Sequence, residues 1–335
     1  MRGEHDPEEL TDQFYFGMIT CEEVYRLNEK MMIGLPRGML FYRYETLWTT
    51  FFQELGCDIL VSESTTQRTL ERGAARAVDE ACLPLKIYYG HVEELIGRCD
   101  YIFVPRISSF GRNRELCTRF ASLYDMTENS FRGRGQRFLT CSVDAKAHST
   151  EADAMLDVGR TLGFADKMVK AAYRTAQREN ARKWKEKLQQ QNRLWKEDGL
   201  KILLAGHSYV IEDGYIGVWI TDHLRRNGVI PIRADVVERE VALRQSEKLS
   251  PTCKWELNRE LLGSVSLYQD RADGLILLSA FPCGADAMTN EILLRRCAET
   301  PTLHVVLDGQ SGTAGLETRL ESFLDIIRFK ERMKT

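Results

Sequence analysis

The sequence predicts an α/β protein with two Rossmann-like domains, each built on a doubly wound, mainly parallel sheet. Short apolar segments that suit strands alternate with longer amphipathic segments that suit helices. This alternation stops at a long helical stretch and then restarts, and 335 residues are more than one hydrophobic core comfortably supports. We therefore expect four parts: a polar N-terminal extension over residues 1–30, a first domain over 31–150, a helical connector over 151–198 and a second domain over 199–335.

The first domain is expected to contain four strands joined by helices. The strands are the apolar segments 32–35, 57–62, 101–104 and 136–142. The helices cover residues 42–55, 66–78 and 84–96, after a short helical piece around residues 20–30. In the helix over 42–55, Leu47, Trp48 and Phe51 share one face, and Gly56 ends it.

The connector and the second domain follow the same reasoning. Residues 183–192 are charged and polar with spaced apolar positions, which is typical of a solvent-flanked helix rather than a nucleic-acid-binding one. Gly199 marks the end of the connector. The strands expected after it are 200–205, 229–232, 275–278 and 302–307, and the helices are 214–227, 254–268, 285–298 and 315–330.

Composition excludes several classes of function. A net charge of −3, from 46 basic and 49 acidic residues, provides no electrostatic drive toward nucleic acid or an anionic membrane. The longest apolar runs are too short to span a bilayer, and the N-terminal residues lack the apolar region of a signal peptide. We therefore expect a cytoplasmic protein that binds neither nucleic acid nor membrane.

Nine cysteines are many for a cytoplasmic chain of this length. A reducing compartment argues against a disulfide framework, and so does the odd count. The sequence contains no Cys-x-x-Cys pair, so the motifs of zinc ribbons and ferredoxins are absent. If the chain binds a metal, its ligands must come from loops that the fold brings together.

Three of these cysteines lie in predicted loops, and two of them, Cys82 and Cys283, come just before an expected helix. Cys82 and Cys283 lie in similar settings, the second directly after a predicted strand, and Cys117 is in another loop. Open α/β folds build their sites at such crossovers, and a helix N-terminus favours the metal-binding thiolate. The alternative is that these thiols are small apolar fillers, and the residues alone leave both interpretations open. Packing is favoured for Cys21, Cys57 and Cys297, and a structural role for Cys99, Cys141 and Cys253.

Three other side chains are weaker candidates for a site. His207 follows a predicted strand, so it either faces a cleft as a proton donor or bonds backbone groups in its loop. Arg106 ends another predicted strand, where it could pair with a bound carboxylate or phosphate, or with Glu80. Ser108 offers a hydroxyl in the same loop as Arg106.

Several segments together resemble the 2-hydroxyacyl-CoA dehydratase superfamily, and the closest branch is that of the acyl-CoA dehydratase activase-related proteins. The segments that carry the resemblance are 33–38, 51–57, 79–86, 90–92, 100–106, 206–209, 281–288, 307–312 and 315–321. The resemblance covers roughly residues 30–330, almost the whole chain. The motifs are specific as a set, although no single one is.

The resemblance implies an oxygen-sensitive iron–sulfur protein whose cofactor lies in the cleft between two Rossmann-like domains. In the family, three cysteine thiolates hold a four-iron cubane or half of a double-cubane cluster, and by position these are Cys82, Cys117 and Cys283. The segment around Cys117 departs from the family pattern, because Thr118 stands where the family has proline. A double cubane would need about twice as many thiolates, and no further trio has comparable flanks, so a single 4Fe-4S cubane is preferred.

The resemblance also implies a function and a partner. An ATP-hydrolysing activase of the actin/hexokinase type would supply low-potential electrons, which this chain would use or relay for reduction or dehydration of a small substrate, with a CoA thioester as one option. The sequence has neither a P-loop nor a dinucleotide-binding glycine motif, so we assign nucleotide dependence to that partner.

Two rival functions stay open. The chain could be a non-catalytic scaffold or regulatory subunit that binds a CoA-like ligand or the activase, or a plain Rossmann-like enzyme whose cysteines only fill space. A homodimer and a second dehydratase-like subunit are the further partners to consider.

Overall fold

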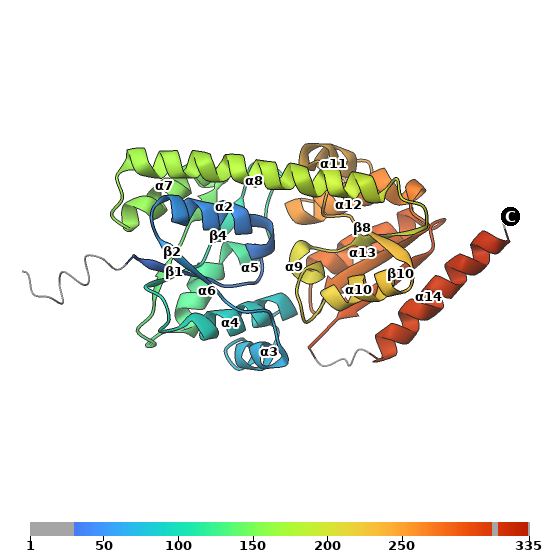
Figure 1. Ribbon diagram of the computed structural model, residues 1–335, viewed down its shortest axis with the longest axis horizontal. Helices are drawn as coiled ribbons and strands as arrows, with labels where there is room; N and C mark the ends of the chain where they lie inside the picture. The colour runs from blue at the N-terminus through green and yellow to red at the C-terminus, as the bar shows by residue number, and fades with distance from the viewer. Residues whose placement is uncertain (1–29, 310–313, 334–335) are drawn as a thin grey trace, which may run out of the picture.

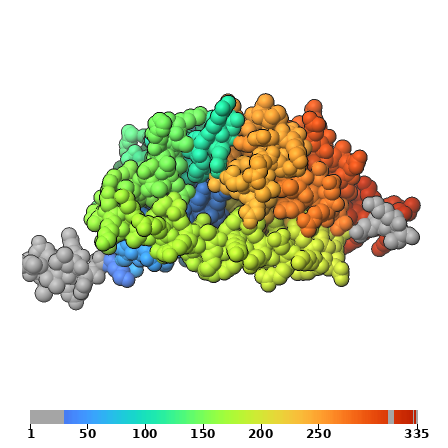
Figure 2. All heavy atoms as spheres, turned by 90° about the horizontal axis from the view of Figure 1, so that it is seen from above, coloured from blue at the N-terminus to red at the C-terminus, as the bar shows by residue number. Residues whose placement is uncertain are grey.

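A computed structural model describes residues 30–309 and 314–333. Two four-stranded sheets lie one after the other along the longest axis, each with helices packed around it (Figure 1). The long helix α8 (Asp166–Leu194) crosses from one half to the other, and in Figure 2 it is the yellow-green band along the lower edge. All strand pairs in these sheets are parallel, which confirms the predicted mixed α/β class.

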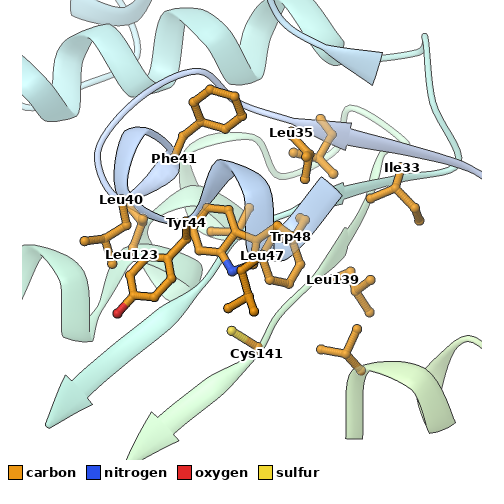
Figure 3. Close-up of a cluster of buried hydrophobic side chains, with 14 of the residues drawn as sticks. Ile33, Leu35, Leu40, Phe41, Tyr44, Leu47, Trp48, Leu123, Leu139 and Cys141 are labelled. Atoms are coloured by element: carbon orange, nitrogen blue, oxygen red, sulfur yellow. The ribbon is translucent and has the colours of Figure 1, made fainter. Parts of the chain in front are cut away.

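The first sheet has the strand order β2-β1-β3-β5. Its strands are β1 (Met32–Leu35), β2 (Asp58–Val61), β3 (Tyr101–Phe103) and β5 (Arg137–Leu139). Helices around it are α2 (Phe41–Glu54), α3 (Gln67–Ala74), α4 (Leu83–Leu95), α5 (Thr118–Ala121) and α6 (Leu123–Ser130). Figure 3 shows Leu47 and Trp48 of α2 beside Leu139 and Cys141, in the hydrophobic core of the first half.

The strand expected over residues 136–142 is two strands instead of one. After β5 the chain starts again as β6 (Ser142–Asp144), which pairs with β4 (Arg106–Ser109) in a separate two-stranded sheet. The backbone N–H of Val104 donates to the carbonyl of Leu139, and that of Arg106 donates to the carbonyl of Cys141. The ladder is interrupted at Pro105 between them, because proline has no N–H to donate. The helix expected over 66–78 is also shorter, because α3 ends at Ala74.

The predicted connector is helical, but it consists of two helices. Thr150 caps α7 (Glu151–Thr161) through a capping box with Asp153. Gly163, with a φ of +85°, then turns the chain before α8 begins. Near the end of α8, the buried amide of Gln191 bonds the backbone of Arg233 on both sides, which anchors the helix to the second half.

The second sheet has the strand order β10-β9-β7-β8. Its strands are β7 (Leu200–Ala205), β8 (Val229–Arg233), β9 (Gly274–Ala280) and β10 (Thr302–Leu307), and all seven residues of β9 are buried. Its helices are α9 (Ser208–Ile211), α10 (Val218–Arg226), α11 (Arg239–Ser246), α12 (Glu256–Tyr268), α13 (Gly284–Arg296) and α14 (Ala314–Arg332). The helix expected from residue 214 starts later because Asp213 caps the backbone N–H groups of Tyr215 and Ile216.

Buried polar contacts join the two halves. Tyr42 and Thr65 of the first half both donate to the buried carboxylate of Asp213 in the second. The guanidinium of Arg43 donates two hydrogen bonds, of 2.7 and 2.9 Å, to the carboxylate of Glu260. The division into domains at residues 31–150 and 199–335 stays a prediction. The helical piece expected around residues 20–30 falls almost wholly outside the described residues.

None of the described helices is long and apolar enough to cross a membrane.

Candidate functional site

Three cysteines share one structural position, the residue that precedes the first turn of a helix. Cys82 precedes α4, Cys117 precedes α5 and Cys283 precedes α13, each with extended backbone. The expectation that Cys82 and Cys283 start new helices is therefore confirmed. No side-chain capping hydrogen bond is made at these positions. Burial raises the pKa of each thiol, and a backbone amide in the following turn opposes part of that rise.

The loops of Cys82 and Cys283 touch directly across the two halves. The backbone N–H of Leu83 donates to the carbonyl of Phe281 over 2.9 Å. Each of these residues lies within two positions of its cysteine. The start of α4 in the first half and the start of α13 in the second are therefore held side by side.

Cys117 joins this group through aromatic contacts. The ring of Phe120, in the helix that Cys117 starts, meets the edge of Tyr209 with centroids 5.9 Å apart. Tyr209 stacks in turn on His207, with centroids 5.0 Å apart and an interplanar angle of 25°. His207 bonds Asp286 in the first turn of α13, so a continuous chain of side-chain contacts links the helix that Cys117 starts with the helix that Cys283 starts.

The three thiols are close enough to act on one another electrostatically. Burial raises the pKa of Cys82, and the neighbouring Cys117 raises it further. Burial is also the main cause of the raised pKa of Cys117 and of Cys283, and the carboxylate of Asp286 adds to both. Without a bound cation these side chains are neutral thiols at neutral pH, and a cationic group among them would favour three thiolates.

His207 belongs to a buried polar network beside the thiols. Its Nε2 donates to Oδ1 of Asp286 over 2.8 Å, and Nδ2 of Asn258 donates to the same oxygen over 2.9 Å. Burial acts to lower the pKa of His207, but Asp286 more than offsets this and the pKa is raised. Burial acts to raise the pKa of Asp286, but His207 more than offsets this and it is lowered. The geometry therefore favours a charged pair.

Tyr209 presents a phenol within electrostatic reach of all three thiols. Its pKa is raised well above the ordinary value by burial first, then by Asp286 and by Cys283, Cys117 and Cys82. The hydroxyl therefore keeps its proton and can only donate or accept a hydrogen bond. Sequence reasoning missed Tyr209, Asn258 and Asp286, and the only available signal was that Asp286 follows Cys283 by three residues.

Arg106 and Ser108 have other contacts. Arg106 pairs with Asp125 of α6 rather than with Glu80, and its guanidinium lies over the ring of Tyr124. The backbone carbonyl of Ser108 accepts a hydrogen bond from the backbone N–H of Leu116, and this bond positions the segment before Cys117. Among the contacts of the described residues, neither side chain reaches the three thiols.

The remaining described cysteines fit a packing role. All eight cysteines of the described residues are free thiols. Cys57, Cys141 and Cys297 are buried, which confirms the packing expected for Cys57 and Cys297. Cys99 and Cys253 are half-buried and donate weakly to nearby carbonyls. Cys21 lies outside the described residues.

The donor set consists of three cysteine sulfurs, and thiolates are the ligands that iron–sulfur clusters use. Within the described part of the chain, no three His, Cys, Asp or Glu side chains are arranged to hold one metal ion.

Two pockets lie near the segments that carry the cysteines. One, of about 320 Å³, is lined on one side by Ala81, Leu83 and Phe281, which neighbour Cys82 and Cys283. The other, of about 260 Å³, lies between Glu115 and a wall formed by Trp255 and α13. At this second place the two halves meet, and Figure 2 shows the turquoise segment of the first half against the orange segment of the second.

Two solved structures from Pseudomonas aeruginosa cover most of the chain at low similarity. They are the SBP FpvC in complex with Mn2+, with 10% identity, a TM-score of 0.30 and 90% of this chain and 98% of that chain covered, and the SBP FpvC in complex with Ni2+, with 11% identity, a TM-score of 0.28 and 90% and 96% covered. Such scores carry no inference about this chain.

A family comparison gives the clearest relationship. No curated protein matches the sequence. Residues 32–237 match the family model described as the CoA enzyme activase uncharacterised domain (DUF2229), which is more than half of the chain and contains Cys82, Cys117 and His207. The chain therefore belongs to the CoA enzyme activase uncharacterised domain family, in agreement with the activase-related branch that its motifs resemble.

Proposed function

We propose that Cys82, Cys117 and Cys283 hold an iron–sulfur cluster of the 4Fe-4S type. In this proposal the chain accepts low-potential electrons from an ATP-dependent activase and uses or relays them for reduction or dehydration of a small substrate. The observation that carries the proposal is that three half-buried thiols, each at the start of a helix and drawn from both halves, lie within electrostatic reach of one another. Membership of the CoA enzyme activase family supports it.

The surroundings of the thiols support a bound cationic cluster. Burial raises the pKa of all three thiols, so three buried negative charges would be costly without a cation among them. The guanidinium of Arg119 and the backbone amides of the following turns oppose this effect. When bound, the cluster would supply one-electron chemistry at low potential, tuned by hydrogen bonds and burial.

The proposed site draws its ligands from both halves of the chain. Cys82 and Cys117 come from the first half and Cys283 from the second, so a cluster would tie two Rossmann-like domains together across the cleft between them. His207 holds a proton on Nε2 against Asp286, and Tyr209 holds one on its hydroxyl. Both groups lie beside the thiols and are available to donate a hydrogen bond there. A single cubane is favoured, because three of the other described cysteines are in cores.

The proposal is tested by anaerobic purification followed by iron and sulfide analysis, absorption and EPR. The wild-type chain should be brown and EPR-active after dithionite reduction. Cys82→Ala, Cys117→Ala and Cys283→Ala should lose the cluster, whereas the matched control Cys253→Ala, a half-buried thiol outside the group, should keep it. Iron-free protein after anaerobic reconstitution, or full retention of the cluster in Cys82→Ala and Cys283→Ala, would contradict the proposal.

A further inference from the structure

The C-terminal helix α14 carries apolar side chains on two opposite faces. Its inner face places the buried side chains of Leu320, Phe323, Leu324 and Ile327 in the core of the second half. Its outer face carries Ile326 and Phe329, and Met333 directly follows the helix, with its backbone N–H bonded to the carbonyl of Phe329. These three residues are 54%, 65% and 73% exposed. Their spacing of three and then four residues places them on one side of the helix. Figure 1 shows that α14 lies at the outer end of the molecule.

This outer stripe differs from the other exposed apolar residues of the described chain. Val78 and Phe281, for example, are exposed one at a time in loops and turns. Isolated apolar residues on a surface are normal, but three in a row along one helix face indicate a contact surface. The spacing is that of the a and d positions of a coiled-coil seam, with Ile326 and Met333 as a and Phe329 as d.

Charged side chains on either flank of the stripe suit a second copy of the same helix. Asp325 lies on one flank and Lys330 on the other, five residues further along. These are g and e positions, and in a parallel pair of helices the g residue of one meets the e residue five positions on in its partner. The side chain of Asp325 is 78% exposed, and its contact with Arg328 in the same helix, at 3.8 Å, is a weak surface pair.

We propose that the outer face of α14 is the interface with a second copy of this chain. Ile326, Phe329 and Met333 of the two copies pack together in parallel, and Asp325 of each copy pairs with Lys330 of the other. The interface is isologous, so one face serves both copies and the assembly closes as a dimer. With three apolar side chains from each copy, the contact is small and the dimer forms only as protein concentration rises. This proposal does not depend on the cluster.

The apolar part of the interface is tested by sedimentation equilibrium of the full chain over a range of protein concentrations. The wild-type chain should move from monomer toward dimer, and Phe329→Glu should stay monomeric with unchanged circular dichroism and thermal unfolding. Val78→Glu, which charges an equally exposed apolar residue elsewhere, should dimerise as the wild type does. A wild-type chain that stays monomeric, or a Phe329→Glu chain that dimerises normally, would overturn the proposal.

The charged part is tested by reversing each partner. Asp325→Lys and Lys330→Asp should each weaken the dimer by roughly tenfold, because each creates two like-charge contacts. The double variant, and an equimolar mixture of the two single variants, should recover wild-type affinity. A dimer that is indifferent to these changes would overturn the proposal. The proposal would also be overturned if the chain dimerised only after deletion of residues 1–29. That result would mean that residues 1–29 of the same chain, and not a second copy, cover the outer face of α14.

Discussion

Nε2 of His207 donates to Oδ1 of Asp286 over 2.8 Å, and the two side chains are 6% and 5% exposed. This bond links the end of β7 to the first turn of α13, the helix that Cys283 starts. The position of Cys283 therefore depends on the buried ion pair between Asp286 and His207, which are 79 residues apart in the sequence.

The first prediction concerns that ion pair. The pKa of Asp286 is lowered, so its stabilising effect is present above its unfolded pKa and is lost as pH falls through its folded pKa. The pKa of His207 is raised, so its effect is present below its unfolded pKa and is lost as pH rises through its folded pKa. Asp286→Asn should therefore cost about 3–5 kcal/mol at pH values between these limits and less in alkali. Urea unfolding of the wild type and Asp286→Asn, from about pH 5.5 into alkali, measures this cost. A variant as stable as the wild type at about pH 5.5 would contradict the ion pair.

A second prediction concerns His91, a fully buried histidine in α4. Burial first, and Arg37 second, lower the pKa of His91 to about 3, and its Nε2 lies 3.0 Å from Oγ1 of Thr65. The unfolded chain takes up a proton at this histidine below about pH 6.5 while the folded chain does not, so stability falls with pH by about 1.4 kcal/mol per unit down to about pH 3.

His91→Gln should remove that part of the acid sensitivity. The measurement is urea unfolding from neutral pH downwards, compared with wild type. The control is His148→Asn at an exposed position, which should leave the slope unchanged. An identical pH slope in wild type and His91→Gln would show that His91 is not held neutral.

A third prediction concerns the close contact between α3 and α4. A Cβ atom on Gly73 would lie 1.7 Å from the backbone oxygen of Lys86, four residues after Cys82, so neither helix can keep its position. Gly73→Ala should destabilise the chain by more than about 3 kcal/mol. Gly284→Ala is the matched control, since its Cβ would meet nothing within 4 Å, and should change stability by less than about 0.5 kcal/mol. Equal thermal unfolding of the two variants would contradict the close packing.

The parts of the fold that follow from local pattern were predictable. The strands over residues 32–35, 200–205 and 302–307 were placed within a residue because each is a short apolar run between turn residues. The short helices α5, α6 and α11 were missed, because eight residues or fewer show too little periodicity to separate them from loops.

The candidate site was predictable only where chemistry is visible in one residue type. The three cysteines could be chosen from the sequence and its resemblance, but the helix after Cys117 and the neighbours of the thiols could not. Asp286 and Tyr209 are ordinary residues until folding places His207 between them. The pairing of Arg106 was left open between a bound anion and Glu80, and its actual partner Asp125 lies in a helix that the sequence did not reveal.

A fourth prediction concerns Tyr209 and depends on the proposed cluster. Tyr209→Phe keeps the ring that stacks on His207 and removes only the hydroxyl. Hydrogen-bond donors near a cluster stabilise its reduced state, so the variant should retain iron but have a more negative reduction potential and altered EPR signals. Redox titration followed by EPR measures this. A potential and spectrum identical to wild type would remove Tyr209 from the surroundings of the cluster.

The central claim is that the three helix-starting thiols together hold one cluster, and iron per chain tests it most directly. After anaerobic reconstitution and removal of loosely bound metal, we predict roughly four iron and four sulfide per wild-type chain. The same treatment should leave almost none in Cys283→Ala, while Cys253→Ala should match wild type. Iron contents that are equal in wild type and Cys283→Ala, whether both high or both near zero, would contradict the account.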